Sequence, residues 1–118
     1  MKSPLEITNT FFEESNDSRI VWGYEGGNGF ENAGTFPTVT EIEGRVSMFF
    51  WSSKERAVAF MEKHVDYSNL SLTEYDYKHF CLLLSDNQEF DIMVVLNSED
   101  RDNIHLLEPG ELLKMCPN

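Results

Sequence analysis

The side chains of this chain that could carry out chemistry are its many carboxylates, three histidines and two cysteines. Asp76 and His79 form the most suggestive pair, because residues three apart lie on the same face of a helix. There they could act as an acid–base couple. An ion pair at the edge of the core is the interpretation we favour, since an unpaired buried charge destabilises a fold.

The cysteines and histidines lack the spacing of a reactive or metal-binding site. Cys81 lies two residues after His79, which places the two side chains on different sides of a helix and prevents a thiol–imidazole pair. Two cysteines are too few for a disulfide framework, so we expect Cys81 and Cys116 as reduced thiols, with Cys81 in or near the core, and a disulfide between the two is the less favoured alternative. His64, His79 and His105 match no metal-ligand spacing and are interpreted as partly buried, hydrogen-bonded side chains. We therefore predict a protein that is not an enzyme and has no catalytic residue, metal or cofactor.

The overall charge is strongly acidic. Nine basic and twenty-one acidic side chains give a formal charge of −12. Such a field repels phosphate groups, which argues against binding to nucleic acids and to anionic membrane surfaces. One interpretation is that the charge only keeps the protein dispersed in solution. The other is that an acidic face recognises a basic protein, and the composition is also compatible with a homodimer.

Aromatic residues together with an acidic loop provide a candidate surface for such a partner. Aromatic side chains are enriched at the centres of protein interfaces, but at strand spacing they belong more often to a core. Both interpretations stay open for the aromatic residues of this chain. The candidate partner-binding residues are Trp22, Tyr24, Trp51, Glu99, Asp100 and Asp102.

Length and hydropathy limit the class of protein. With 118 residues, of which 41% are hydrophobic, the chain is sized for one domain over residues 1–118. No apolar run approaches the roughly 18 to 20 residues that a membrane-spanning helix needs. Glu6 stands where a signal peptide would have its apolar segment. We therefore expect a soluble, cytoplasmic protein.

A strand over residues 45–51 followed by a helix over 54–65 is expected to organise the fold. Large apolar side chains at 48–51 point to both faces of the strand, which predicts an interior strand covered on both sides. Ser52 and Glu55 match a capping box at the start of the helix. Because no base or oxyanion partner is visible in the sequence, Ser52 is interpreted as a cap rather than as a nucleophile.

The other segments complete an α+β pattern. A helix over 4–15 should end early, because acids such as Glu14 lie unfavourably at its C-terminal end. Ser71 and Glu74 match a second capping box, which predicts a second central helix over 72–84. The remaining predicted elements are strands over 19–24, 30–32, 35–42, 90–96 and 104–107, a hairpin turn at 26–29 and a short helix over 110–115. We predict a mainly antiparallel sheet of about five strands with the two central helices packed on one face, plus short helices at both ends of the chain.

The order of these segments resembles a known family. The segments that carry the resemblance are Phe11-Phe12, Val21-Trp22-Gly23, a glycine turn, Phe50-Trp51-Ser52-Ser53 followed by Glu55-Arg56-Ala57, an apolar strand and Leu107 to Leu112. With them the chain resembles an uncharacterised bacterial family, the domain of unknown function 2750. It is more distantly similar to the N-terminal domain of SseB-like proteins, which shares the Phe-Trp-Ser-Ser-x-Glu-Arg-Ala arrangement. The resemblance implies a fold and a bacterial cytoplasmic setting, and it implies no reaction.

The acidic charge and the missing catalytic set lead to one functional hypothesis. We predict a non-enzymatic protein-binding module, an immunity-type inhibitor or adaptor, whose acidic surface meets a basic partner. The alternative is a small enzyme or a ligand-sensing module that uses the Asp76 and His79 pair.

Overall fold

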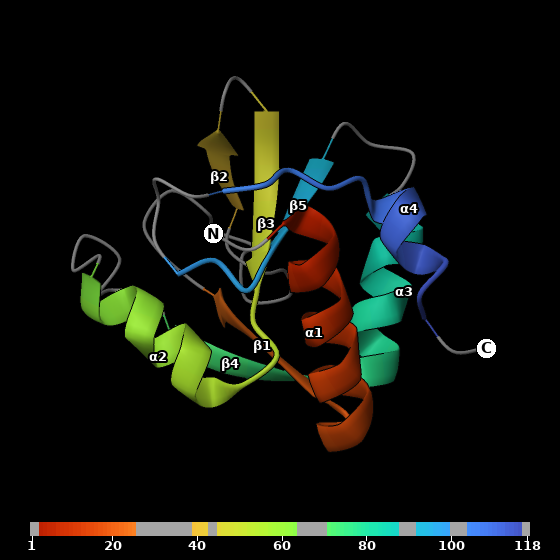
Figure 1. Cartoon of the computed structure of the whole chain (residues 1–118). Helices are drawn as coiled ribbons and strands as arrows, with labels where there is room; N and C mark the ends of the chain where they lie inside the picture. Colours follow the sequence, from red (N-terminus) through yellow and green to blue (C-terminus); the bar gives the residue numbers. More distant parts are fainter. Residues whose placement is uncertain are drawn as a thin grey trace.

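The computed structural model describes residues 3–25, 39–42, 45–63, 71–87, 92–99 and 104–116 (Figure 1). Its elements follow in the order α1 (Pro4–Ser18), β1 (Ile20–Glu25), β2 (Val39–Ile42), β3 (Arg45–Phe50), α2 (Lys54–Lys63), β4 (Ser71–Asp76), α3 (Tyr77–Asn87), β5 (Ile92–Leu96) and α4 (Pro109–Leu113). The predicted α+β class is therefore confirmed. The predicted strand at 30–32 and the predicted turn at 26–29 lie outside the described residues.

The strands form two small sheets. β3 pairs antiparallel with β2 on one side and parallel with β5 on the other, while β1 pairs antiparallel with β4. Reciprocal backbone hydrogen bonds of 2.8 Å between Trp22 and Trp51 join the two sheets. The prediction of one mainly antiparallel sheet was wrong in this respect. The chain between β3 and β5 contains α2, β4 and α3, and it serves as the long crossover that a parallel pair needs.

β3 is the central strand of its sheet and is covered on both faces, as its sequence predicts. Met48 and Phe50 belong to a larger core with side chains of α1, α3 and α4. Phe49 and Trp51 point to the opposite face and pack with α2 in a smaller core. Figure 1 shows α1, α3 and α4 together and α2 apart from them. The prediction that the two central helices share one face was wrong, because each apolar face of the strands needs its own cover.

The segment predicted as the second central helix is divided between a strand and a helix. β4 pairs along its whole length with β1 and ends at Asp76. The Asp76 carboxylate accepts a hydrogen bond from the Lys78 amide at 3.0 Å, so Asp76 rather than Ser71 stands at the start of α3. The burial of these residues alternates as in a strand, since Tyr75 is buried while Glu74 and Asp76 are exposed.

α1 continues beyond its predicted end. It stops where Arg19 adopts a left-handed backbone conformation, with φ of 64°, and donates its amide to the Ser15 carbonyl at 2.7 Å. Glu14, which was expected to shorten the helix, forms an ion pair with Arg56 of α2 at 2.9 Å. This opposite charge offsets the unfavourable position of Glu14 near the helix C-terminus.

Gly23 of β1 packs closely enough that a larger residue should destabilise the fold. A Cβ atom at this position would lie 3.1 Å from Tyr75 Cε2 and 3.5 Å from the Phe49 carbonyl oxygen. We expect Gly23→Ala to lower the free energy of unfolding by about 1 to 3 kcal/mol, the usual range for overpacking. Urea denaturation measures the change. Combining Gly23→Ala with Tyr75→Leu should give less than the sum of the two single losses, and full additivity would show that the close contact does not limit this site.

Candidate functional site

The acid–base pair suggested by the sequence is not assembled. The Asp76 carboxylate caps α3, and His79 stacks its ring on Tyr75 with the ring centres 6.0 Å apart. Both Asp76 and His79 are exposed, and no hydrogen bond or ion pair joins them in this described part of the chain. Residues three apart share a face only within one continuous helix, whereas Asp76 is the last residue of β4 and His79 belongs to α3. The two side chains therefore do not form a site in this structure.

Two of the candidate aromatic residues lie in the smaller core. Trp51 is 2% exposed and donates its indole N–H to the Ser98 carbonyl at 2.8 Å. Tyr24 is 7% exposed and donates its hydroxyl to the Ala57 carbonyl at 2.8 Å. Trp22 is half-buried and packs against the same core. A partner-binding surface must therefore use other side chains than Tyr24 and Trp51.

The acidic loop and the histidines form no binding or metal site among the described residues. Glu99 is exposed, and Asp100, Asp102 and His64 lie outside the described ranges. His105 is half-buried. Within those ranges, no three His, Cys, Asp or Glu side chains are grouped in a way that could hold a metal ion. The described helices include none that is both long and apolar enough to cross a membrane.

A partly buried polar network joins the junction between β3 and α2 to α1 and to the end of β5. Ser52, which is 3% exposed, donates its hydroxyl to Glu14 Oε1 at 2.5 Å and its amide to Asn97 Oδ1 at 2.9 Å. Asn97 Nδ2 donates in turn to Ser52 Oγ at 3.0 Å. Arg56 holds both oxygens of Glu14, with Nε at 3.0 Å from Oε1 and Nη2 at 2.9 Å from Oε2. The network thus connects α1, β3, α2 and β5 through side chains that lie far apart in the sequence.

This network has a structural role. Ser53, rather than the predicted Ser52, caps α2, because its hydroxyl accepts from the Arg56 amide at 3.2 Å. A serine beside a carboxylate can form a nucleophile and its base. Here Ser52 is buried, and both oxygens of Glu14 are occupied by Arg56. The hydrogen bonds to Glu14 raise the pKa of Arg56, so the guanidinium stays charged and keeps hold of the carboxylate.

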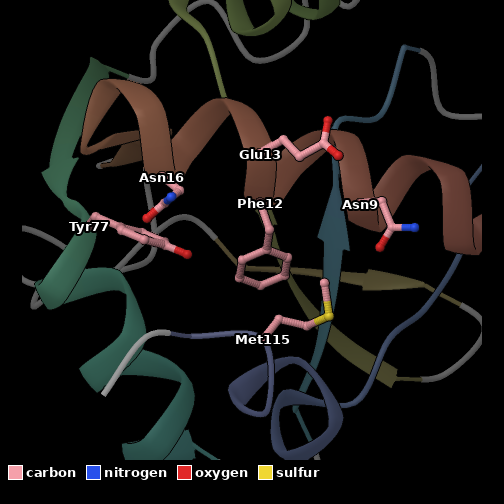
Figure 2. A pocket seen from close by; sticks show the side chains of 6 residues that line it. All are labelled: Asn9, Phe12, Glu13, Asn16, Tyr77 and Met115. Carbon is pink, nitrogen blue, oxygen red and sulfur yellow. The ribbon is translucent and has the colours of Figure 1, made fainter.

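Two adjoining hollows on the face formed by α1, α3 and the segment after α4 are the candidate binding site. Tyr77 lines both, and we call them the α1 hollow and the α3 hollow. The α1 hollow has a volume of about 360 Å³ and is lined by Asn9, Phe12, Glu13, Asn16, Tyr77 and Met115 (Figure 2). The α3 hollow has a volume of about 510 Å³ and is lined by Arg19, Tyr77, Lys78, Cys81, Leu82, Ser85, Leu113 and Cys116.

Exposed apolar side chains stand at both hollows. Met115 is 40% exposed at the α1 hollow, where Figure 2 shows Phe12 pointing from α1 toward it. Leu82 is 60% exposed at the α3 hollow. Leu82 belongs to the apolar run 81–84, which winds around the helix and cannot face inward at every position. Apolar side chains that gather on a surface are typical of interaction sites.

A disulfide between Cys81 and Cys116 borders the α3 hollow. It ties α3 to the segment after α4, with the two Cα atoms 6.2 Å apart. The expectation of two reduced thiols was wrong. The packing of α4 on α3 brings together residues that are 35 positions apart in the chain, and sequence spacing does not reveal such a contact.

Tyr77 is the wall that the two hollows share. It is 2% exposed, its amide donates to the Arg19 carbonyl at 3.0 Å, and the Arg19 guanidinium carbon lies 5.3 Å from its ring centre. This distance is typical of a cation–π contact. Burial raises the pKa of the Tyr77 phenol, an effect that the charge of Arg19 opposes. The phenol therefore stays neutral at physiological pH, and the ring offers an uncharged surface to both hollows.

Fold and site together define a small α+β protein with paired surface hollows among three helical segments. The chain belongs to the family described as protein of unknown function (DUF2750), whose model matches residues 8–115. The resemblance seen in the sequence is thereby confirmed for this family. No curated protein and no solved structure matches the chain.

Proposed function

We propose that the protein is a non-enzymatic protein-binding module, an immunity-type inhibitor or adaptor, that contacts its partner through the α1 and α3 hollows. One observation carries this proposal. Leu82 and Met115, two large apolar side chains that are 60% and 40% exposed, stand at adjoining hollows that share Tyr77 as their wall. Large apolar side chains over a pocketed surface are the usual anchors of protein interfaces.

The charge of the surface favours a basic partner. The acidic side chains that are exposed in the described residues are Glu6, Glu13, Asp17, Glu55, Glu62, Glu74, Asp76, Asp86, Glu99, Glu108 and Glu111. Such a field attracts a basic protein, speeds the encounter and repels a second copy of the same chain. A soluble, cytoplasmic location, expected from the sequence, is part of this proposal.

The alternative functions have weaker support. A small enzyme built on Asp76 and His79 has no observation in its favour, because the two side chains make separate contacts. A ligand-sensing module would need a concave pocket that buries most of a small molecule. The two hollows open to the surface and suit a protein segment better.

Leu82→Ser should weaken partner binding by roughly tenfold or more, because it removes an exposed apolar anchor at the α3 hollow. The measurement is affinity capture from the native cell with identification by mass spectrometry, followed by titration of the purified partner. Leu5→Ser is the matched control, since Leu5 is 68% exposed and lines neither hollow. Equal capture by both variants would reject the hollows as the binding surface.

The same titration tests the electrostatic part of the proposal. Association with a basic partner should slow as ionic strength rises from low to physiological, because screening shortens the reach of the acidic surface. A partner that is acidic, or an association rate indifferent to salt, would count against recognition by charge.

A further inference from the structure

We propose that the α3 hollow binds a partner segment in which a carboxylate stands beside a large apolar side chain. This inference rests on the proposed function and names the chemistry that the α3 hollow would recognise. It concerns the side chains around Arg19, Lys78 and Leu82, and the disulfide is part of the same wall.

Arg19 and Lys78 are two positive charges that pair with no carboxylate of the described residues. In the part of the chain that the structure describes, Arg56 and Lys114 each form an ion pair with a glutamate, whereas Arg19 and Lys78 form none, and neither do Lys54 and Lys63 of α2, which line neither hollow. Both are exposed and line the α3 hollow, whose described lining includes no acidic residue. In a chain with a formal charge of −12, this hollow is a local site of positive charge and favours an anion.

The guanidinium of Arg19 is held in place before any partner arrives. Its Nη1 donates to Asn16 Oδ1 at 3.1 Å, and its carbon lies 5.3 Å from the ring centre of Tyr77. The other N–H groups of this side chain make no hydrogen bond within the described residues. A guanidinium with donors to spare is suited to a carboxylate, which it can bind through two parallel hydrogen bonds. Because Arg19 is already positioned, less side-chain entropy is lost on binding.

The rest of the α3 hollow is apolar. Leu82 is 60% exposed and Leu113 is half-buried, and the disulfide is a further apolar part of the lining. A free inorganic anion would leave these side chains in water. A segment with Asp, Glu or a C-terminal carboxylate next to Leu, Phe or a similar residue would cover them and neutralise the two cations.

An acidic segment is compatible with a partner that is basic overall. The acidic surface acts over a distance and attracts the body of the partner, while Arg19 and Lys78 act only at contact range in the hollow. A partner with uniform positive charge would place a cation against these two side chains and be rejected. The two cations in the hollow therefore add specificity to the long-range attraction between the acidic surface and a basic partner.

Fluorescence anisotropy with the full chain and four labelled peptides tests the inference. The first peptide has a glutamate between leucine and phenylalanine, and the second replaces that glutamate with glutamine. The third ends in a leucine with a free carboxylate, and the fourth is its C-terminal amide. We expect the carboxylate member of one pair to bind roughly tenfold or more tightly than its neutral counterpart, and the pair that discriminates identifies the source of the carboxylate.

Lys78→Gln and Arg19→Gln should each reduce this discrimination several-fold. Lys63→Gln is the matched control, because Lys63 is exposed on α2, lines neither hollow and changes the net charge by the same amount. The Lys78 side chain forms no hydrogen bond or ion pair within the described residues, so Lys78→Gln gives a clear result even if Arg19→Gln disturbs folding. Equal binding of charged and neutral peptides, no binding of any peptide, or an equal effect of Lys63→Gln would each overturn the inference. None of these outcomes alters the Leu82→Ser result, which tests the proposed function separately.

Discussion

Reduction of the Cys81–Cys116 disulfide should lower the free energy of unfolding by about 3 to 4 kcal/mol, the value that loop-closure entropy gives for a loop of this size. The bond closes a loop between residues 35 positions apart. It also secures α4, a helix of five residues that is too short to be stable by itself. Chemical denaturation with and without a reductant measures the difference, and free thiols counted under native conditions report the starting state.

Serine variants separate the effect of the bond from that of the reagent. Cys81→Ser, Cys116→Ser and the double variant should all unfold at a similar midpoint, close to that of the reduced wild type. The double variant should not respond to reductant. If the reduced and oxidised wild type unfold at the same midpoint, the disulfide does not contribute to stability. The count of free thiols also bears on the proposed cytoplasmic location, since a cysteine pair in the cytoplasm is usually kept reduced.

Asn97→Ala should destabilise the protein by about 2 to 4 kcal/mol, because it combines a lost buried hydrogen-bond partner with an unfavourable backbone conformation. Asn97 is 8% exposed, has φ of 50° and accepts the Ser52 amide at 2.9 Å. Without the Asn97 side chain this buried amide donor loses its acceptor. Urea denaturation monitored by tryptophan fluorescence measures the change.

Two further variants divide the effect at Asn97 into its parts. Asn97→Gly removes the same side chain but tolerates a positive φ, so it should be about 1 kcal/mol less destabilising than Asn97→Ala. Asn9→Ala, at an exposed position of α1, should change stability by less than about 0.5 kcal/mol. A wild-type midpoint for Asn97→Ala would show that the network around Ser52 is not required for the fold.

The sequence predicted the elements whose signals are local. β1, β3 and β5 were expected from runs of β-branched and aromatic residues, and α2 from a serine followed by an apolar stripe. Residues 71–76 were wrongly predicted as part of a helix, because a capping-box pattern and a strand pattern coexist there. The pairing of β4 with β1 decides between them, and this is a contact between distant parts of the chain.

The candidate site could be predicted only in fragments. Phe12 lies on α1, Tyr77 and Leu82 lie on α3, and Met115 follows α4. Their common surface exists only after α1, α3 and α4 have packed. The signal for Leu82 was its place in an apolar run too long for one buried face. Arg19 gave no signal, because nothing in a turn sequence shows which ring its side chain will cover. The partners of Ser52 were equally hidden, since Glu14 and Asn97 are far from it in the chain.

The left-handed backbone of Arg19 has an energetic cost. The residue just after a helix C-terminus in this conformation is most often glycine, and a side chain there is disfavoured by about 1 kcal/mol. Arginine occupies the position in this protein, with φ of 64°. A chain optimised for stability alone would carry glycine at this turn and lose the charge beside Tyr77. Arginine at this turn therefore combines an unfavourable backbone conformation with a positive charge held beside Tyr77.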